Sequence, residues 1–148
     1  MAVMGDDAGD GRPNIEQELT AWVATSSPAP VAVWLFGSAA AGAMRSDSDV
    51  DVAVLTADPA RRIPAVERWA LAADLARRLG RDVDLVDLRA APTVLQMQVV
   101  STGRRVVCRD PAAAEAFESL VWAMYVRFVE SRRDIVDDAV RRGTIHGR

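Results

Sequence analysis

The sequence predicts one domain of the α/β (α+β) class, with helices packed on a small mixed β-sheet. Short apolar runs bounded by glycine, proline or charged residues recur along the chain and have the length of buried strands. Segments with apolar residues at helical spacing lie between them, and the last such segment is long enough for many helical turns. A chain of 148 residues can bury a core of this kind without disulfides or a structural metal.

The first half of the chain predicts one helix followed by two strands. Asn14–Thr25 has an apolar stripe at helical spacing, and Asn14 is a favourable N-cap residue. Val31–Phe36 is apolar throughout and lies between proline and glycine, which favours a central strand buried on both faces. Val50–Leu55 is the second predicted strand, and residues 1–13 are expected to form a flexible tail.

The second half predicts three helices and two further strands. The first of these helices, Ile63–Leu79, is ended by Gly80, and its apolar stripe consists of Val66, Trp69, Ala70, Ala73 and Ala76. A third strand, a helix, a short edge strand and a long last helix follow, at Val83–Leu88, Thr93–Val100, Arg104–Cys108 and Ala112–Arg142. Residues 14–110 are therefore expected to form the core, with the C-terminal helical segment 111–148 packed on it.

Several large or soft side chains are expected inside the protein. Burial is the usual role of the indole ring, so all four tryptophans are expected in the core: Trp22, Trp34, Trp69 and Trp122. Cys108, beside a predicted strand, is expected to be a small core residue. The last helix carries its own apolar series, at Phe117, Leu120, Val121, Met124 and Phe128.

Composition argues against a nucleic-acid-binding or membrane protein. Acidic residues outnumber basic ones by 21 to 18, so the chain lacks the basic excess that phosphate backbones attract. No apolar stretch approaches the ~20 residues that span a bilayer, and the acidic, glycine-rich start is unlike a signal peptide. One cysteine cannot form an internal disulfide, which fits a reducing cytoplasm.

The residue types that are missing narrow the chemistry. All 18 basic residues are arginines, so no lysine is available for covalent catalysis. The single histidine, His146, lies close to the C-terminus, which is a poor place to hold a catalytic base. One histidine and one cysteine are too few ligands for a typical zinc site. Carboxylates remain as the chemical resource.

Two short motifs flank the loop between the first two strands. Gly37-Ser38 follows the first strand, where glycine permits a sharp turn and the close approach of a phosphate, and the small residues Ala39–Ala41 can offer free N–H groups. After ten intervening residues, Asp49 and Asp51 stand two apart, so on a strand their carboxylates share one face about 6–7 Å apart. Mg²⁺ prefers such oxygen ligands, together with substrate phosphates. The combination predicts metal-assisted nucleotide transfer.

Two-metal nucleotidyl transfer usually needs a third carboxylate as base and metal ligand. Three candidates lie around the third predicted strand, at Asp82, Asp84 and Asp87. Asp84 is preferred because an unpaired charge within an apolar strand is costly and so requires a reason. Asp82 is the reserve, since it shares the strand face of Asp84, whereas solvated acids at strand ends, such as Asp82 and Asp87, need no functional explanation.

These motifs resemble the minimal nucleotidyltransferases of the DNA polymerase β superfamily, above all the antitoxin half of HEPN/MNT toxin–antitoxin pairs. The resemblance covers about residues 15–110 and rests on Phe36-Gly37-Ser38, Gly42, Ser48-Asp49-Val50-Asp51 and Val83-Asp84-Leu85-Val86-Asp87-Leu88. It implies a polymerase β-like nucleotidyltransferase fold and ATP as nucleotide donor. It also implies two Mg²⁺ ions on Asp49, Asp51 and Asp84, with Gly37, Ser38 and Ser48 binding the nucleotide.

The resemblance further implies a partner. Relatives of this kind transfer AMP to a tyrosine of a HEPN ribonuclease toxin and so silence it. Many of them carry arginine where this chain has Ala41, so either Arg45 compensates or a contact with the nucleotide or the partner is weaker. Two alternatives stay open: an antitoxin that only binds its partner, and the catalytic subunit of a small-molecule nucleotidyltransferase.

Overall fold

The computed structural model describes residues 14–38, 40 and 48–143. Ala39, Ala41, Gly42, Arg45 and the predicted tail 1–13 lie outside these residues, as does His146. Four helices and four strands follow one another within the described ranges: α1 (Ile15–Thr25), β1 (Ala32–Phe36), β2 (Val50–Leu55), α2 (Ala65–Leu79), β3 (Val83–Asp87), α3 (Thr93–Thr102), β4 (Arg104–Cys108) and α4 (Pro111–Arg142). The predicted order of elements is confirmed, with boundaries that move by at most two residues.

Local signals explain where the helices begin and end. The Asn14 side chain accepts a hydrogen bond from the backbone N–H of Gln17 (3.1 Å), and Asp110 does the same for Ala113 (3.1 Å). Gly80 ends α2 in a left-handed conformation with φ +65°. Pro64 is the N-cap of α2, so this helix starts two residues later than the sequence predicts.

The four strands form a mixed sheet in the order β3-β2-β1-β4. β1 is antiparallel to both β2 and β4, whereas β2 and β3 are parallel. All five residues of β1 are buried, which confirms a central strand covered on both faces. β4 lies at the edge of the sheet, as predicted, and β3 forms the other edge.

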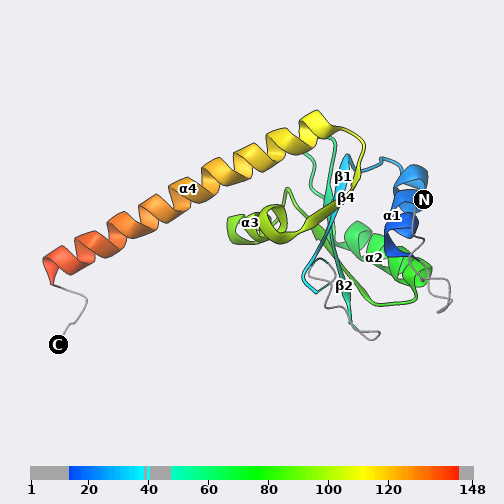
Figure 1. Cartoon of the computed structure of the whole chain (residues 1–148), viewed down its shortest axis with the longest axis horizontal. Coiled ribbons are helices and arrows are strands. Elements are labelled where there is room, and N and C mark those ends of the chain that lie inside the picture. The colour runs from blue at the N-terminus through cyan, green and yellow to red at the C-terminus, as the bar shows by residue number, and fades with distance from the viewer. Residues whose placement is uncertain (1–13, 39, 41–47, 144–148) are drawn as a thin grey trace, which may run out of the picture.

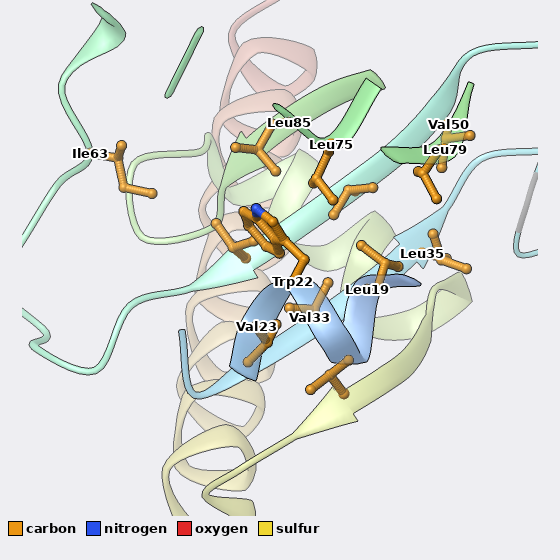
Figure 2. Packing of buried hydrophobic residues seen from close by; sticks show 13 residues of the cluster. Leu19, Trp22, Val23, Val33, Leu35, Val50, Ile63, Leu75, Leu79 and Leu85 are labelled. Atoms are coloured by element: carbon orange, nitrogen blue, oxygen red, sulfur yellow. The ribbon is translucent and has the colours of Figure 1, made fainter. Parts of the chain in front are cut away.

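Helices cover both faces of the sheet (Figure 1). Figure 2 shows the face under α1 and α2, where Leu19 and Trp22 of α1 and Leu75 of α2 converge over Val33 of β1. On the opposite face Trp34 and Phe36 of the sheet belong to a second apolar cluster, with residues of α3 and the first turns of α4. Burial of apolar side chains on both faces is the main term that stabilises the fold.

Only the beginning of α4 is buried in this core. Its buried residues are Ala114, Phe117 and Val121, and beyond them the helix extends away from the sheet (Figure 1). Trp122 is accordingly 48% exposed, so its predicted core position is wrong. None of the helices in the described part of the chain is long and apolar enough to cross a membrane.

Two other core predictions are wrong. The apolar stripe predicted for α2 is not its buried face: Val66 is 80% and Trp69 74% exposed, Ala73 and Ala76 are only half-buried, and the helix buries Leu75 and Leu79 instead. Cys108 is exposed, because it ends an edge strand whose preceding residue, Val107, is the one turned into the core. Trp22 and Trp34 are buried as predicted.

Candidate active site

Gly37 forms the turn at the end of β1 in a conformation that other residues rarely adopt. Its φ is +65°, in the left-handed region. A Cβ atom at this position would lie 2.3 Å from Oδ2 of Asp51 and 3.3 Å from its Cγ. The absence of a side chain at Gly37 therefore leaves the space that the Asp51 carboxylate occupies.

The sheet register aligns the turn with two of the predicted acids. Asp51 of β2 is paired with Phe36, the residue before Gly37, and on its other side with Asp84 of β3. Residues paired across neighbouring strands project from the same face, so Asp51 and Asp84 are adjacent on one face of the sheet. Asp49 stands just before β2, two residues from Asp51, and is exposed. The structure thus brings the three predicted carboxylates to the same end of the sheet, where β1 ends and β2 begins. This end of the sheet is called the carboxylate edge below.

The three acids influence one another electrostatically. Burial raises the pKa of Asp51, and the nearby carboxylates of Asp84 and then Asp49 raise that pKa further. All three causes disfavour the charged form of Asp51 in the protein without a cation. A divalent cation among these oxygens would reverse that preference, since metal binding favours deprotonated ligands.

These residues fit Mg²⁺ in donor chemistry. Within the ranges that the structure describes, no three or more acidic, histidine or cysteine side chains form a preassembled metal cluster. Mg²⁺ needs no such cage, because it is commonly held by one or two carboxylates with water and substrate phosphates completing the shell. The open carboxylates of Asp49 and Asp51 next to the Gly37 turn suit that mode of binding.

Ser38 and Ser48 border the same edge from two sides. Ser38 is half-buried in the turn after β1, and Ser48 is half-buried just before β2. Of the anion-binding turn expected at Ala39–Ala41, only Ala40 belongs to the residues that the structure describes.

The acids around β3 differ from the sequence-based interpretation. Asp87, expected to be a solvated acid, is only 2% exposed, and its carboxylate accepts hydrogen bonds from the backbone N–H of Ile63 (2.8 Å) and Arg89 (3.1 Å). It therefore has a structural role. Asp84 is exposed, so the argument that its charge is costly within the strand is wrong, although its alignment with Asp51 makes it the acid nearest the candidate site. Asp82 is also exposed and precedes the strand.

Sequence reasoning missed one cation at this edge. Arg81 is half-buried and lies before β3, next to Asp82, whose carbonyl accepts a hydrogen bond from the backbone N–H of Val50 (2.9 Å). Only the parallel pairing of β2 with β3 brings Arg81 close to the start of β2, and no local motif announces such pairing.

A cavity of about 590 Å³ lies elsewhere, at the other end of the sheet. Its wall includes Trp22, Thr56 and Ile63 but none of the predicted site residues. The ionisable groups in that wall are Asp58 and two ion pairs, Arg61 with Glu67 and Arg78 with Asp74, so four of the five are already paired with one another. The carboxylate edge, not this cavity, has the groups that nucleotide chemistry requires.

Comparison with known proteins identifies the family of this chain. Residues 18–112 match the family of polymerase beta nucleotidyltransferases, a range that contains all the predicted site residues. The protein adenylyltransferase MntA of Shewanella oneidensis is 41% identical over 108 residues, which cover 73% of this chain and 75% of MntA.

Two solved structures are similar over most of their length. One is a toxin–antitoxin with AMP-PNP, 37% identical with a TM-score of 0.73, and the match covers 84% of this chain and 98% of that one. The other is the tri-AMPylated Shewanella oneidensis HEPN toxin in complex with MNT antitoxin. It is 35% identical with a TM-score of 0.67, over 85% of this chain and 96% of that one.

Proposed function

This chain belongs to the polymerase beta nucleotidyltransferase family, and we propose that it is an antitoxin that uses ATP to place AMP on a tyrosine of a HEPN-type ribonuclease toxin. The observation that carries the proposal is that the Gly37 turn after β1, Asp51 of β2 and Asp84 of β3 lie side by side at one end of the sheet. The relatives support it, since one is a protein adenylyltransferase and another was solved with an AMPylated HEPN toxin.

We propose that different residues of the carboxylate edge bind the phosphates of ATP and the metal ion. We propose that Gly37, Ser38 and Ser48 bind the phosphates of ATP, because the turn allows close approach of the backbone and the serines add hydroxyl donors. Asp49 and Asp51, with Asp84, would hold Mg²⁺. When bound, Mg²⁺ neutralises charge that develops on the transferring phosphate.

The transfer itself is proposed to be direct. Asp84 accepts the proton of the tyrosine hydroxyl while the tyrosine oxygen forms a bond to the α-phosphorus of ATP. The bond from that phosphorus to the bridging oxygen breaks, and pyrophosphate leaves with the electron pair. The tyrosine gains one AMP and no atom of this chain is modified. In the proposed setting, the cytoplasm supplies ATP and the toxin supplies the acceptor.

The experiment is transfer of labelled AMP to purified toxin in the presence of ATP and Mg²⁺. Asp49→Asn and Asp51→Asn are expected to abolish transfer and neutralisation, whereas Glu115→Gln, an exposed acid on α4, should retain both. Undiminished transfer by both aspartate variants would overturn the metal assignment. Neutralisation without transfer would favour the antitoxin that only binds, and transfer to a small hydroxyl compound instead of the toxin would favour the small-molecule enzyme.

A further inference from the structure

Exposed large hydrophobic side chains gather on α4. Nine of the twelve found in the described part of the chain belong to this helix: Leu120, Trp122, Met124, Val126, Phe128, Val129, Ile135, Val136 and Val140. A single exposed apolar residue needs no explanation, but a contiguous series marks an interaction surface. Among the described elements, α4 therefore exposes the apolar surface that a binding partner would cover.

Three members of the series continue a face that is already used for packing. Phe117 and Val121 are buried against the sheet, and Met124, Phe128 and Ile135 follow them at the 3-, 4- and 7-residue spacing that keeps one helical face. These three side chains, here called the α4 stripe, are 42%, 41% and 67% exposed. From Val121 to the end of the helix the face runs on for roughly 30 Å at 1.5 Å per residue, beyond the reach of the sheet.

The α4 stripe lies on the same side of the sheet as the candidate catalytic acids. Phe36 packs in one apolar cluster with Phe117 and Val121. Because Phe36, Asp51 and Asp84 are paired across the strands, their side chains project from that same face. A protein seated along the stripe would thus stand on the face of the sheet from which the side chains of Asp51 and Asp84 project.

We propose that the α4 stripe is the docking surface for the substrate protein, which packs a helix of its own against it. The proposal rests on the proposed function and adds the place of contact. The 3–4 spacing of the apolar residues suits helix-on-helix packing. A transferase that modifies a protein side chain must hold that protein, and the related chains were solved as toxin–antitoxin complexes. The side of the acids favours the toxin over a second copy of this chain.

The test uses charge at exposed positions that do not support the fold. The double variant Met124→Glu with Phe128→Glu keeps good helix formers in α4. Its control is Val66→Glu with Trp69→Glu, which charges two positions on α2, a helix on the opposite face of the sheet. Their side chains are 80% and 74% exposed, against 42% and 41% for Met124 and Phe128. Affinity for the purified HEPN-type toxin is measured by calorimetry, ATP binding by equilibrium dialysis, and oligomeric state by ultracentrifugation.

The expected result is at least a ~10-fold loss of toxin affinity for the α4 variant, with ATP binding unchanged and the α2 control unaffected. Unchanged toxin affinity of the α4 variant overturns the inference, even if AMP transfer by the parent chain proves correct. Loss of self-association with intact toxin binding also overturns it, because a second copy would then be the occupant. If the parent binds toxin through α4 without modifying it, the docking surface stands and the proposed function fails.

Discussion

Gly37 and Asp51 lie so close across the β1–β2 pair that a Cβ atom on Gly37 would come 2.3 Å from Oδ2 of Asp51. Glycine is therefore required twice at this position, once for its φ of +65° and once for the space taken by the carboxylate. The candidate phosphate turn and a candidate metal ligand are thus coupled through one contact. A substitution in the turn should therefore displace the Asp51 carboxylate.

We predict that Gly37→Ala nearly abolishes AMP transfer, because the new methyl group must push the Asp51 carboxylate aside. Gly80→Ala is the matched control, since Gly80 has the same φ of +65° but nothing within 4 Å of its hypothetical Cβ. Both variants should lose about 1–2 kcal/mol of stability from the left-handed backbone, measured by denaturant unfolding. Equal transfer rates in the two variants would contradict the proposed coupling.

The raised pKa of Asp51 predicts a pH-dependent gain in stability on removing its charge. Burial and the neighbouring acids disfavour the charged form in the folded state, so the cost is fully present above the folded pKa and vanishes below the ordinary value of 3.8. In chelator at neutral pH, Asp51→Asn should raise the melting temperature by on the order of 2 °C. The gain should shrink as the pH falls through the folded pKa.

Asp74 provides a control of opposite sign. A hydrogen bond from Arg77, together with the charges of Arg78 and Arg77, lowers the pKa of Asp74, so its charged form favours the folded state. Asp74→Asn should therefore lower the melting temperature slightly at neutral pH, with an effect that fades on acidification. The same direction of change for both variants would show that the neighbours of Asp51 do not act as described.

Asp87 is predicted to matter for folding and not for chemistry. Replacing it by alanine leaves the buried N–H of Ile63 without its acceptor, at a cost of about 1–3 kcal/mol. Denaturant unfolding of Asp87→Ala should show this loss, while the kcat of the folded fraction stays near that of the parent. Asp82→Ala, which removes an exposed acid just before the same strand, should unfold like the parent. A large fall in kcat for Asp87→Ala at full folding would refute the structural role.

Substitutions at Asp84 and at Ser38 should change different steady-state kinetic parameters. If Asp84 is the base, Asp84→Ala should lower kcat by roughly 10²-fold or more with little change in the KM for ATP. Ser38→Ala should chiefly raise that KM, because backbone donors remain at the phosphate turn. The reverse pattern would mean that the two roles have been exchanged.

The sequence predicted the elements well because their signals are local. Continuous apolar residues marked β1, and Asn14 and Gly80 marked helix ends. The face that α2 buries could not be chosen in this way. Val66 and Trp69 satisfy a helical period as well as Leu75 and Leu79 do, and only the position of the sheet decides between the two faces.

The sequence names the candidate site residues but not how they are arranged relative to one another. Asp49 and Asp51 could be placed together because they stand two residues apart at the start of one strand, whereas the pairing of Asp51 with Asp84 depends on the parallel register of β2 and β3. Asp87 was wrongly interpreted as a solvated acid for a similar reason, because its burial depends on a contact with a residue far away in the sequence. Its partner, the N–H of Ile63, lies 24 residues away in the chain, on a segment whose path the sequence does not specify.

The last prediction concerns the route of AMP. With no lysine in the chain and its only histidine at position 146, a nucleotidylated intermediate on either residue type is disfavoured. Direct attack by the acceptor hydroxyl requires only that donor and acceptor be held in line. In mixtures with toxin, ATP and Mg²⁺, intact-mass spectrometry should therefore show AMP added to the toxin and no added mass on this chain at any time. An AMP increment on this chain that later passes to the toxin would refute the direct route, and an unmodified chain incubated with ATP alone serves as the reference.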